Sequence, residues 1–114
     1  MPYLKIQTNQ NLDELRQSAL LKQASQTVAQ QLGKPESYVM ITLEAGRSML
    51  FAGSDAPLAY LELKSIGLPA QATAKLSQAL CTLMAERLGV AQDRVYIEFA
   101  DAMPQMWGWN GDTF

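Results

Sequence analysis

The feature that most limits how this chain can fold is a pattern that occurs twice, 56 residues apart. Gly33 and Gly89 each follow a stretch of helical periodicity, at the position where glycine commonly ends a helix. The apolar residues around the two glycines align in pairs: Ala29 with Ala85, Leu32 with Leu88, Val39 with Val95, Ile41 with Ile97, and Leu43 with Phe99. Each half therefore has the pattern strand, helix, strand.

Periodicity places the elements within each half. Alternating residues predict strands over residues 2–8, 38–44, 58–66 and 93–100, with turn signals filling 45–57. Two starts are possible for the first helix. Asn11 and Glu14 resemble a capping box, but the helix could equally begin at Ser18. Its expected inward stripe is Leu21, Ala24, Val28 and Leu32. A second helix is predicted over residues 70–88. Its buried stripe should consist of Leu76, Leu80, Leu83, Met84 and Leu88, with Cys81 beside them in the core.

A helix that connects two strands makes them parallel neighbours, joined by a right-handed crossover. We therefore predict an α+β fold, a two-layer α/β sandwich. Its two pseudo-symmetric βαβ units form a four-stranded mixed sheet with two helices on one face. Residues 1–114 are expected to form a single domain, with the internal repeat at 2–45 and 58–101 and a C-terminal tail at 102–114.

Composition excludes several classes of function. The net charge is −2 with no basic cluster, which argues against a nucleic-acid partner. No apolar run approaches a membrane span, and the N-terminus does not resemble a signal peptide, so we expect no membrane partner and a cytoplasmic location. Because the chain has no histidine and one cysteine, we expect no metal site and no histidine-based catalysis.

Pro2 opens the first predicted strand and is the first candidate for chemistry. If Met1 is removed, Pro2 becomes the chain terminus and its nitrogen becomes a secondary amine. Burial in an apolar pocket disfavours the charged form of an amine and lowers its pKa. Such a group could act as a general base near neutral pH. The alternative is that Pro2 only starts a strand, at a position where a missing N–H does no harm.

The predicted topology brings other groups to the same end of the sheet. The next strand runs parallel to the first, so Lys34 should arrive near Pro2, where it could favour the neutral amine and hold an anion. Equally, Lys34 could be a solvated cation at a helix C-terminus. If the second half is turned over, a backbone N–H near Lys64, Ser65 and Ile66 could bind a carboxylate. Lys64 and Ser65 fit equally well as surface residues.

The tail holds an unusual set of large apolar side chains in a segment that resembles a loop. They are Met103, Met106, Trp107, Trp109 and Phe114. They could fold back on their own chain, or pack on another subunit and form the wall of a pocket there.

Together these residues resemble the macrophage migration inhibitory factor and D-dopachrome tautomerase family of the tautomerase superfamily. The resemblance covers essentially the whole chain. The matching segments are Met1-Pro2, Gly33-Lys34-Pro35 with Tyr38, Ser65-Ile66-Gly67, Ala85-Glu86-Arg87-Leu88, Asp93-Arg94-Val95-Tyr96-Ile97, Gly108-Trp109-Asn110 and Thr113-Phe114.

The resemblance implies a homotrimer with active sites at subunit boundaries. It implies keto–enol tautomerisation of phenylpyruvate-like α-keto acids, small aromatic substrates, and of dopachrome-type compounds, without a cofactor. Pro2 would be the base, and Lys34 and the backbone of Ile66 would hold the carboxylate. Tyr96 of a neighbouring subunit would line the aromatic slot, with Tyr38 near it.

The resemblance also implies a second kind of role. Members of the family act as extracellular signalling proteins and leave cells without a signal peptide, so a cell-surface receptor is a further expected partner. The alternative function is therefore a cytokine-like trimer with weak or vestigial catalysis.

Three positions depart from the pattern of the animal cytokine. Glu98 stands where the best-known animal protein has asparagine, and its charge could repel an anionic ring substituent and raise the Pro2 pKa. Trp107 replaces a smaller aliphatic residue, so we expect a narrower slot. Leu58 and Leu61 occupy the positions of a Cys-x-x-Cys pair, which argues against thiol-oxidoreductase activity.

Overall fold

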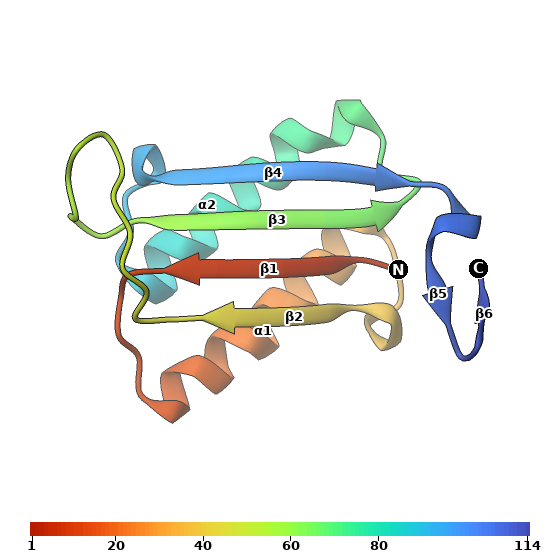
Figure 1. Ribbon diagram of the computed structural model, residues 1–114, viewed down its shortest axis with the longest axis horizontal. Helices are drawn as coiled ribbons and strands as arrows, with labels where there is room; N and C mark the ends of the chain where they lie inside the picture. Colours follow the sequence, from red (N-terminus) through yellow and green to blue (C-terminus); the bar gives the residue numbers. More distant parts are fainter.

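Two βαβ units share one sheet in the computed structural model, which describes all 114 residues (Figure 1). The first unit consists of β1 (Tyr3–Thr8), α1 (Glu14–Leu32) and β2 (Met40–Glu44). The second consists of β3 (Ala59–Ile66), α2 (Thr73–Leu88) and β4 (Val95–Ala102). The tail adds a small hairpin of β5 (Gly108–Trp109) and β6 (Asp112–Thr113). The predicted α+β architecture is confirmed.

The strand order is β2-β1-β3-β4, with parallel pairs at both edges and an antiparallel pair, β1 with β3, at the centre. In that central pair Tyr3 lies opposite Lys64 and Ile6 lies opposite Leu61. The second unit is therefore turned over relative to the first. As a result the start of β1, the loop before β2 and the ends of β3 and β4 lie at one end of the sheet (Figure 1).

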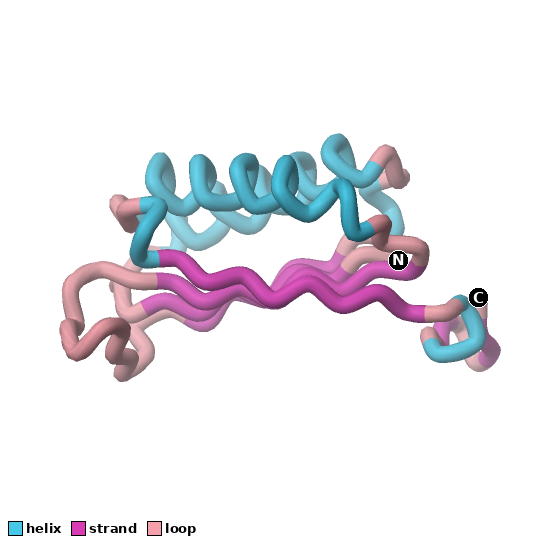
Figure 2. The backbone as a smooth tube through the Cα atoms, turned by 90° about the horizontal axis from the view of Figure 1, so that it is seen from above, coloured by secondary structure: helices cyan, strands magenta, loops and turns pink.

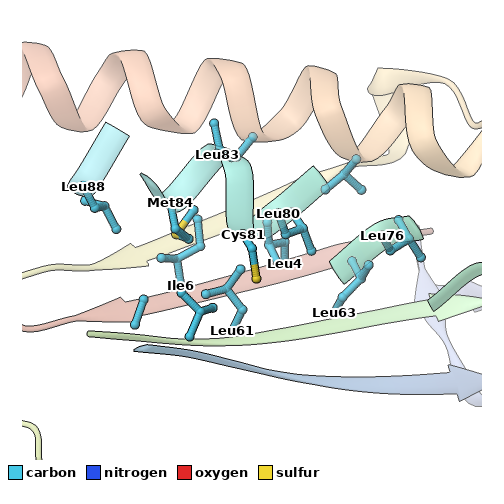
Figure 3. Packing of buried hydrophobic residues seen from close by; sticks show 14 of the residues in the cluster. Leu4, Ile6, Leu61, Leu63, Leu76, Leu80, Cys81, Leu83, Met84 and Leu88 are labelled. Carbon is cyan, nitrogen blue, oxygen red and sulfur yellow. The ribbon is translucent and has the colours of Figure 1, made fainter. Parts of the chain in front are cut away.

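Both helices cover the same face of the sheet and leave the other face open (Figure 2). The core lies between these layers, where alternate residues of the central strands meet the inward stripe of α2 (Figure 3). Leu4 and Ile6 of β1 are completely buried, as are Leu61 and Leu63 of β3. The predicted stripe of α2 is buried along its length, and Cys81 lies beside it. Neither helix is long and apolar enough to cross a membrane.

The predictions for α1 need two corrections. Its N-cap is Asp13, whose carboxylate accepts a hydrogen bond from the Arg16 backbone N–H at 2.8 Å, rather than Asn11 or Ser18. Its buried residues are Leu20, Ala24, Val28 and Ala29. Ala24 and Val28 of the predicted stripe are therefore confirmed and Leu32 packs partly buried against the core, whereas Leu20 takes the place of Leu21. Leu20, Ala24 and Val28 recur every four residues and form one row along the helix. Leu21 is turned away from that row and is only partly buried.

Both outer strands begin later than predicted, for the same reason in each unit. A 3₁₀ turn at Glu36–Tyr38 delays β2 to Met40, and a matching turn at Gln92–Arg94 delays β4 to Val95. A third such turn delays α2 to Thr73. Gly33 and Gly89 end the helices in the left-handed conformation, with φ of 63° and 65°, as predicted.

The tail differs most from expectation, because it forms the β5–β6 hairpin rather than a loop. Asn110 and Gly111 form its turn with φ of 54° and 77°, the positive values that a tight hairpin turn of this kind requires. The Asn-Gly pair is therefore a sequence signal for this hairpin that the periodicity analysis missed.

Leu80→Ala should lower the free energy of unfolding by about 2–5 kcal/mol, because it leaves a cavity in a core where Leu80 is 1% exposed. The matched control is Leu15→Ala on α1, where the side chain is 84% exposed and the change should stay within about 0.5 kcal/mol. Urea unfolding at one fixed protein concentration measures both. Equal losses in the two variants would contradict this account of the core.

Candidate functional site

A pocket of about 540 Å³ lies at the end of the sheet where the chain begins. The first residues of the chain, the loop into β2, β2 itself, the end of β3 and the tail hairpin all contribute to it. Its lining residues are Met1, Pro2, Tyr3, Ser37, Tyr38, Val39, Met40, Thr42, Lys64, Trp107, Gly108, Trp109 and Phe114. The wall is therefore largely apolar and aromatic, and it contains no aspartate or glutamate.

Pro2 lies in this pocket immediately before β1, with its side chain fully buried. Its carbonyl accepts a hydrogen bond from the Met40 backbone N–H at 3.0 Å, which ties the start of β1 to β2. The free amine of the full chain belongs to Met1. Burial lowers the pKa of this amine below its ordinary value of 8.0, and the nearby Lys34 ammonium lowers the pKa further. The surroundings of the chain terminus thus favour a neutral amine.

Lys34 reaches from the end of α1 to the end of β3. Its ammonium donates one hydrogen bond to the Ser65 hydroxyl at 2.9 Å and another to the Ile66 carbonyl. Both acceptors are neutral oxygens, so no carboxylate cancels the charge of Lys34 at these contacts. The structure thus brings Lys34, Ser65 and Ile66 together beside the chain terminus.

Ser65 corrects one of the alternatives left open by the sequence, because it is completely buried rather than a surface residue. Alternation along β3 explains this: Ser65 follows Leu61 and Leu63 on the helix side of the sheet, while Lys64 points to the open side. Lys64 lines the pocket, a placement that the sequence analysis did not favour over an ordinary surface position. The period-two pattern through Leu61 and Leu63 was the signal that could have separated the two residues.

An aromatic cluster closes the pocket on the tail side. Trp109 stacks on Phe114 with ring centroids 5.4 Å apart, and Tyr38 meets both rings edge-on at 6.4 and 5.9 Å. Trp107 also lines the pocket, and its carbonyl accepts a hydrogen bond from the Phe114 backbone N–H. These tail residues contact one another and Tyr38 of their own chain, but Trp109 is still 58% exposed, and Met103 and Met106 are 62% and 77% exposed.

Tyr96 and Glu98 do not reach the pocket of their own chain. Both lie on β4 at the open face, where Tyr96 packs against Phe51 with centroids 4.5 Å apart and is still 64% exposed. Glu98 accepts a hydrogen bond from the Tyr60 hydroxyl at 2.9 Å. This bond, with burial and the charge of nearby Glu62, raises the pKa of Tyr60 to about 12.

The chemistry available at this site follows from its composition. Aromatic walls suit a flat apolar ligand, cationic residues at the rim suit an anion, and an amine of lowered pKa can exchange a proton. No group of three histidine, cysteine, aspartate or glutamate side chains is arranged to hold a metal ion.

Comparison with known proteins agrees with the sequence resemblance. The model of the macrophage migration inhibitory factor (MIF) family matches residues 1–114. A macrophage migration inhibitory factor homolog from Brugia malayi is 43% identical over 115 residues, covering 100% of this chain and 99% of the relative. A Xenopus laevis protein named D-dopachrome decarboxylase-B is 36% identical and covers 97% of this chain and 95% of its own length.

Solved structures support the same relationship. The crystal structure of a macrophage migration inhibitory factor homologue from Prochlorococcus marinus superposes with a TM-score of 0.92 at 41% identity, covering 98% of each chain. A homologous factor from Toxoplasma gondii superposes with a TM-score of 0.91 at 34% identity, covering 98% of this chain and 99% of its own. At the level of the family, this relationship supports a tautomerase or cytokine-like function. The chain belongs to the macrophage migration inhibitory factor family.

Proposed function

We propose that this protein is a cofactor-independent keto–enol tautomerase of phenylpyruvate-like α-keto acids and dopachrome-type compounds, with the Pro2 amine as its general base. The observation that carries this proposal is the pocket that joins Pro2 to an aromatic wall, beside a terminus where burial and Lys34 lower the pKa of an amine. Removal of Met1 would place the free amine on Pro2 itself.

The proposed reaction moves one proton between oxygen and carbon. In the ketone-forming direction, the neutral Pro2 amine takes the proton of the enol hydroxyl. The oxygen lone pair then forms the carbonyl, and the carbon–carbon double bond takes the proton back from the Pro2 ammonium at the benzylic carbon. No atom is gained or lost, so the amine returns to its starting state and needs no cofactor.

Lys34 and the Ile66 backbone are the proposed carboxylate-binding groups. Lys34 already lies at the end of β3 with only neutral oxygens as hydrogen-bond acceptors, so a substrate carboxylate would be its charged partner. Tyr38, Trp107 and the stacked Trp109 and Phe114 would hold the substrate ring.

We further propose a homotrimer, in which Tyr96 and Glu98 of one subunit complete the pocket of the next. The two edge strands of the sheet, β2 and β4, are different, and contact between unlike edges can close into a ring. Exposed apolar side chains lie on both: Met40 on β2 and Tyr96 on β4, each 64% exposed. Burial between subunits would cover them.

The second candidate function is a signalling trimer that binds a cell-surface receptor, supported by the cytokine-like function of the family. In that case the protein would act outside the cell. For the tautomerase, the cytoplasm is the proposed location.

Replacing the base tests the leading proposal. Pro2→Gly should reduce the phenylpyruvate tautomerase activity by about 10²-fold or more, the scale of losing a positioned base. A spectrophotometric assay of enol–keto conversion measures it, on protein whose intact mass shows that Met1 is absent. Pro69→Gly, in the loop before α2, is the control and should keep the activity. Unchanged activity in Pro2→Gly would exclude Pro2 as the base.

Replacing Lys34 should change the pH profile as well as the affinity. A neighbouring cation disfavours the protonated amine, so its removal in Lys34→Met raises the amine pKa. Because the neutral amine is the base, the acidic limb of the kcat/KM profile should move to higher pH, and KM should rise. Lys22→Met, at an exposed position of α1, is the control. If the acidic limb of the kcat/KM profile stays at the same pH in Lys34→Met, Lys34 does not lower the pKa of the base.

The trimer can be tested by complementation. Light scattering should give three times the chain mass of 12.6 kDa. Inactive Pro2→Gly chains refolded with equal amounts of inactive Tyr96→Ala chains should regain activity, because random assembly leaves about a quarter of the boundary sites with both native residues. A monomeric mass, or no recovery on mixing, would contradict shared sites.

A further inference from the structure

Lys64 is the one charged side chain among the residues that line the pocket. We propose that Lys64 forms a second anion-binding position, so that the pocket selects aromatic α-keto acids that carry a second carboxylate. This inference rests on the proposed function, because it names the class of substrate for the same site.

The sheet brings two lysines to the chain terminus from opposite sides. Lys34 approaches from the helix layer, where it binds the buried Ser65 hydroxyl and the Ile66 carbonyl. Lys64 precedes Ser65 on β3, so its side chain lies on the open face, opposite Tyr3 in the register of β1. Lys64 lines the pocket itself, whereas Lys34 is not among the lining residues and stands at the end of β3, where it binds Ser65 and Ile66.

The charge balance at the pocket favours an anion at Lys64. No aspartate or glutamate lines the pocket. The nearest carboxylate is that of Glu62, 3.6 Å from the Lys64 ammonium, and the Lys64 side chain is half exposed. An exposed ion pair of this length contributes little, so a ligand carboxylate can replace Glu62 as the partner. Glu98, the other acid proposed for the assembled site, accepts a hydrogen bond from the neutral Tyr60 hydroxyl, which cancels no charge, so the second carboxylate of a ligand would have to lie closer to Lys64 than to Glu98.

The shape of the pocket defines the rest of the ligand. Its volume of about 540 Å³ is in the range of small-molecule sites. The stacked Trp109 and Phe114 provide a wall for an aromatic ring. With the keto-acid carboxylate at Lys34, a second carboxylate on the ring would be directed to Lys64. A ligand with one acidic group would leave Lys64 paired only with Glu62.

Two unreactive ligands of the same shape test this directly: 4-carboxyphenylacetate, with two negative charges, and 4-carbamoylphenylacetate, with one. Quenching of Trp107 and Trp109 fluorescence reports their binding. The native protein should bind the dianion about threefold to tenfold more tightly, Lys64→Met should bind both ligands equally, and Lys64→Arg should restore the preference. Lys75→Met, on α2 and outside this pocket, is the control and should keep the preference.

Equal binding of the two ligands by the native protein would overturn the proposal, and so would a preference that survives in Lys64→Met. Circular dichroism checks the fold of the variant. A second measurement on the native protein needs no substitution, since added salt should weaken dianion binding more than monoanion binding. Because neither ligand reacts, these results are independent of the Pro2→Gly assay, and the two proposals can fail separately.

Discussion

The antiparallel pairing of β1 with β3 joins the two halves of this protein and places the groups at its chain terminus. Each βαβ unit alone would have one open edge at its first strand, and the pairing joins these two edges at the centre of the sheet. It buries Leu4 and Ile6 against Leu61 and Leu63 under the helices (Figure 3). It also inverts the second unit, so the end of β3 meets the beginning of β1. Without that inversion Ser65 and Ile66 would lie far from the chain terminus.

The inverted pairing gives the chain terminus an unusual electrostatic setting. Lys34 from the first unit is held by Ser65 and Ile66 from the second, and this places an ammonium next to the terminal amine. Burial disfavours the charged form of the terminal amine, and the Lys34 ammonium disfavours a second positive charge beside it, so the pKa of the amine is lowered. The fold thus links an ordinary contact between its two halves to the acid–base property of its first residues.

Sequence reasoning succeeded where the signal was local and repeated. The paired glycines, the stripe of α2 and the alternation in the strands specified the two units and their topology. It was wrong about the cap of α1, because Asn11, Asp13 and Ser18 are all residue types that cap helices, and the carboxylate that accepts the hydrogen bond of the Arg16 backbone N–H is that of Asp13. It missed the tail hairpin, whose two-residue strands are too short to show any period.

The repeat, the fold class and the candidates Pro2 and Lys34 could be read from spacing along the chain alone. The folded chain was needed to show that Ser65 is a buried partner of Lys34, that Lys64 lines the pocket, and that Tyr96 and Glu98 lie away from it. Alternation along a strand shows which residues share a face of the sheet, but it does not show what that face contacts. The residues that each face of the sheet contacts are set by packing between units that are distant in sequence.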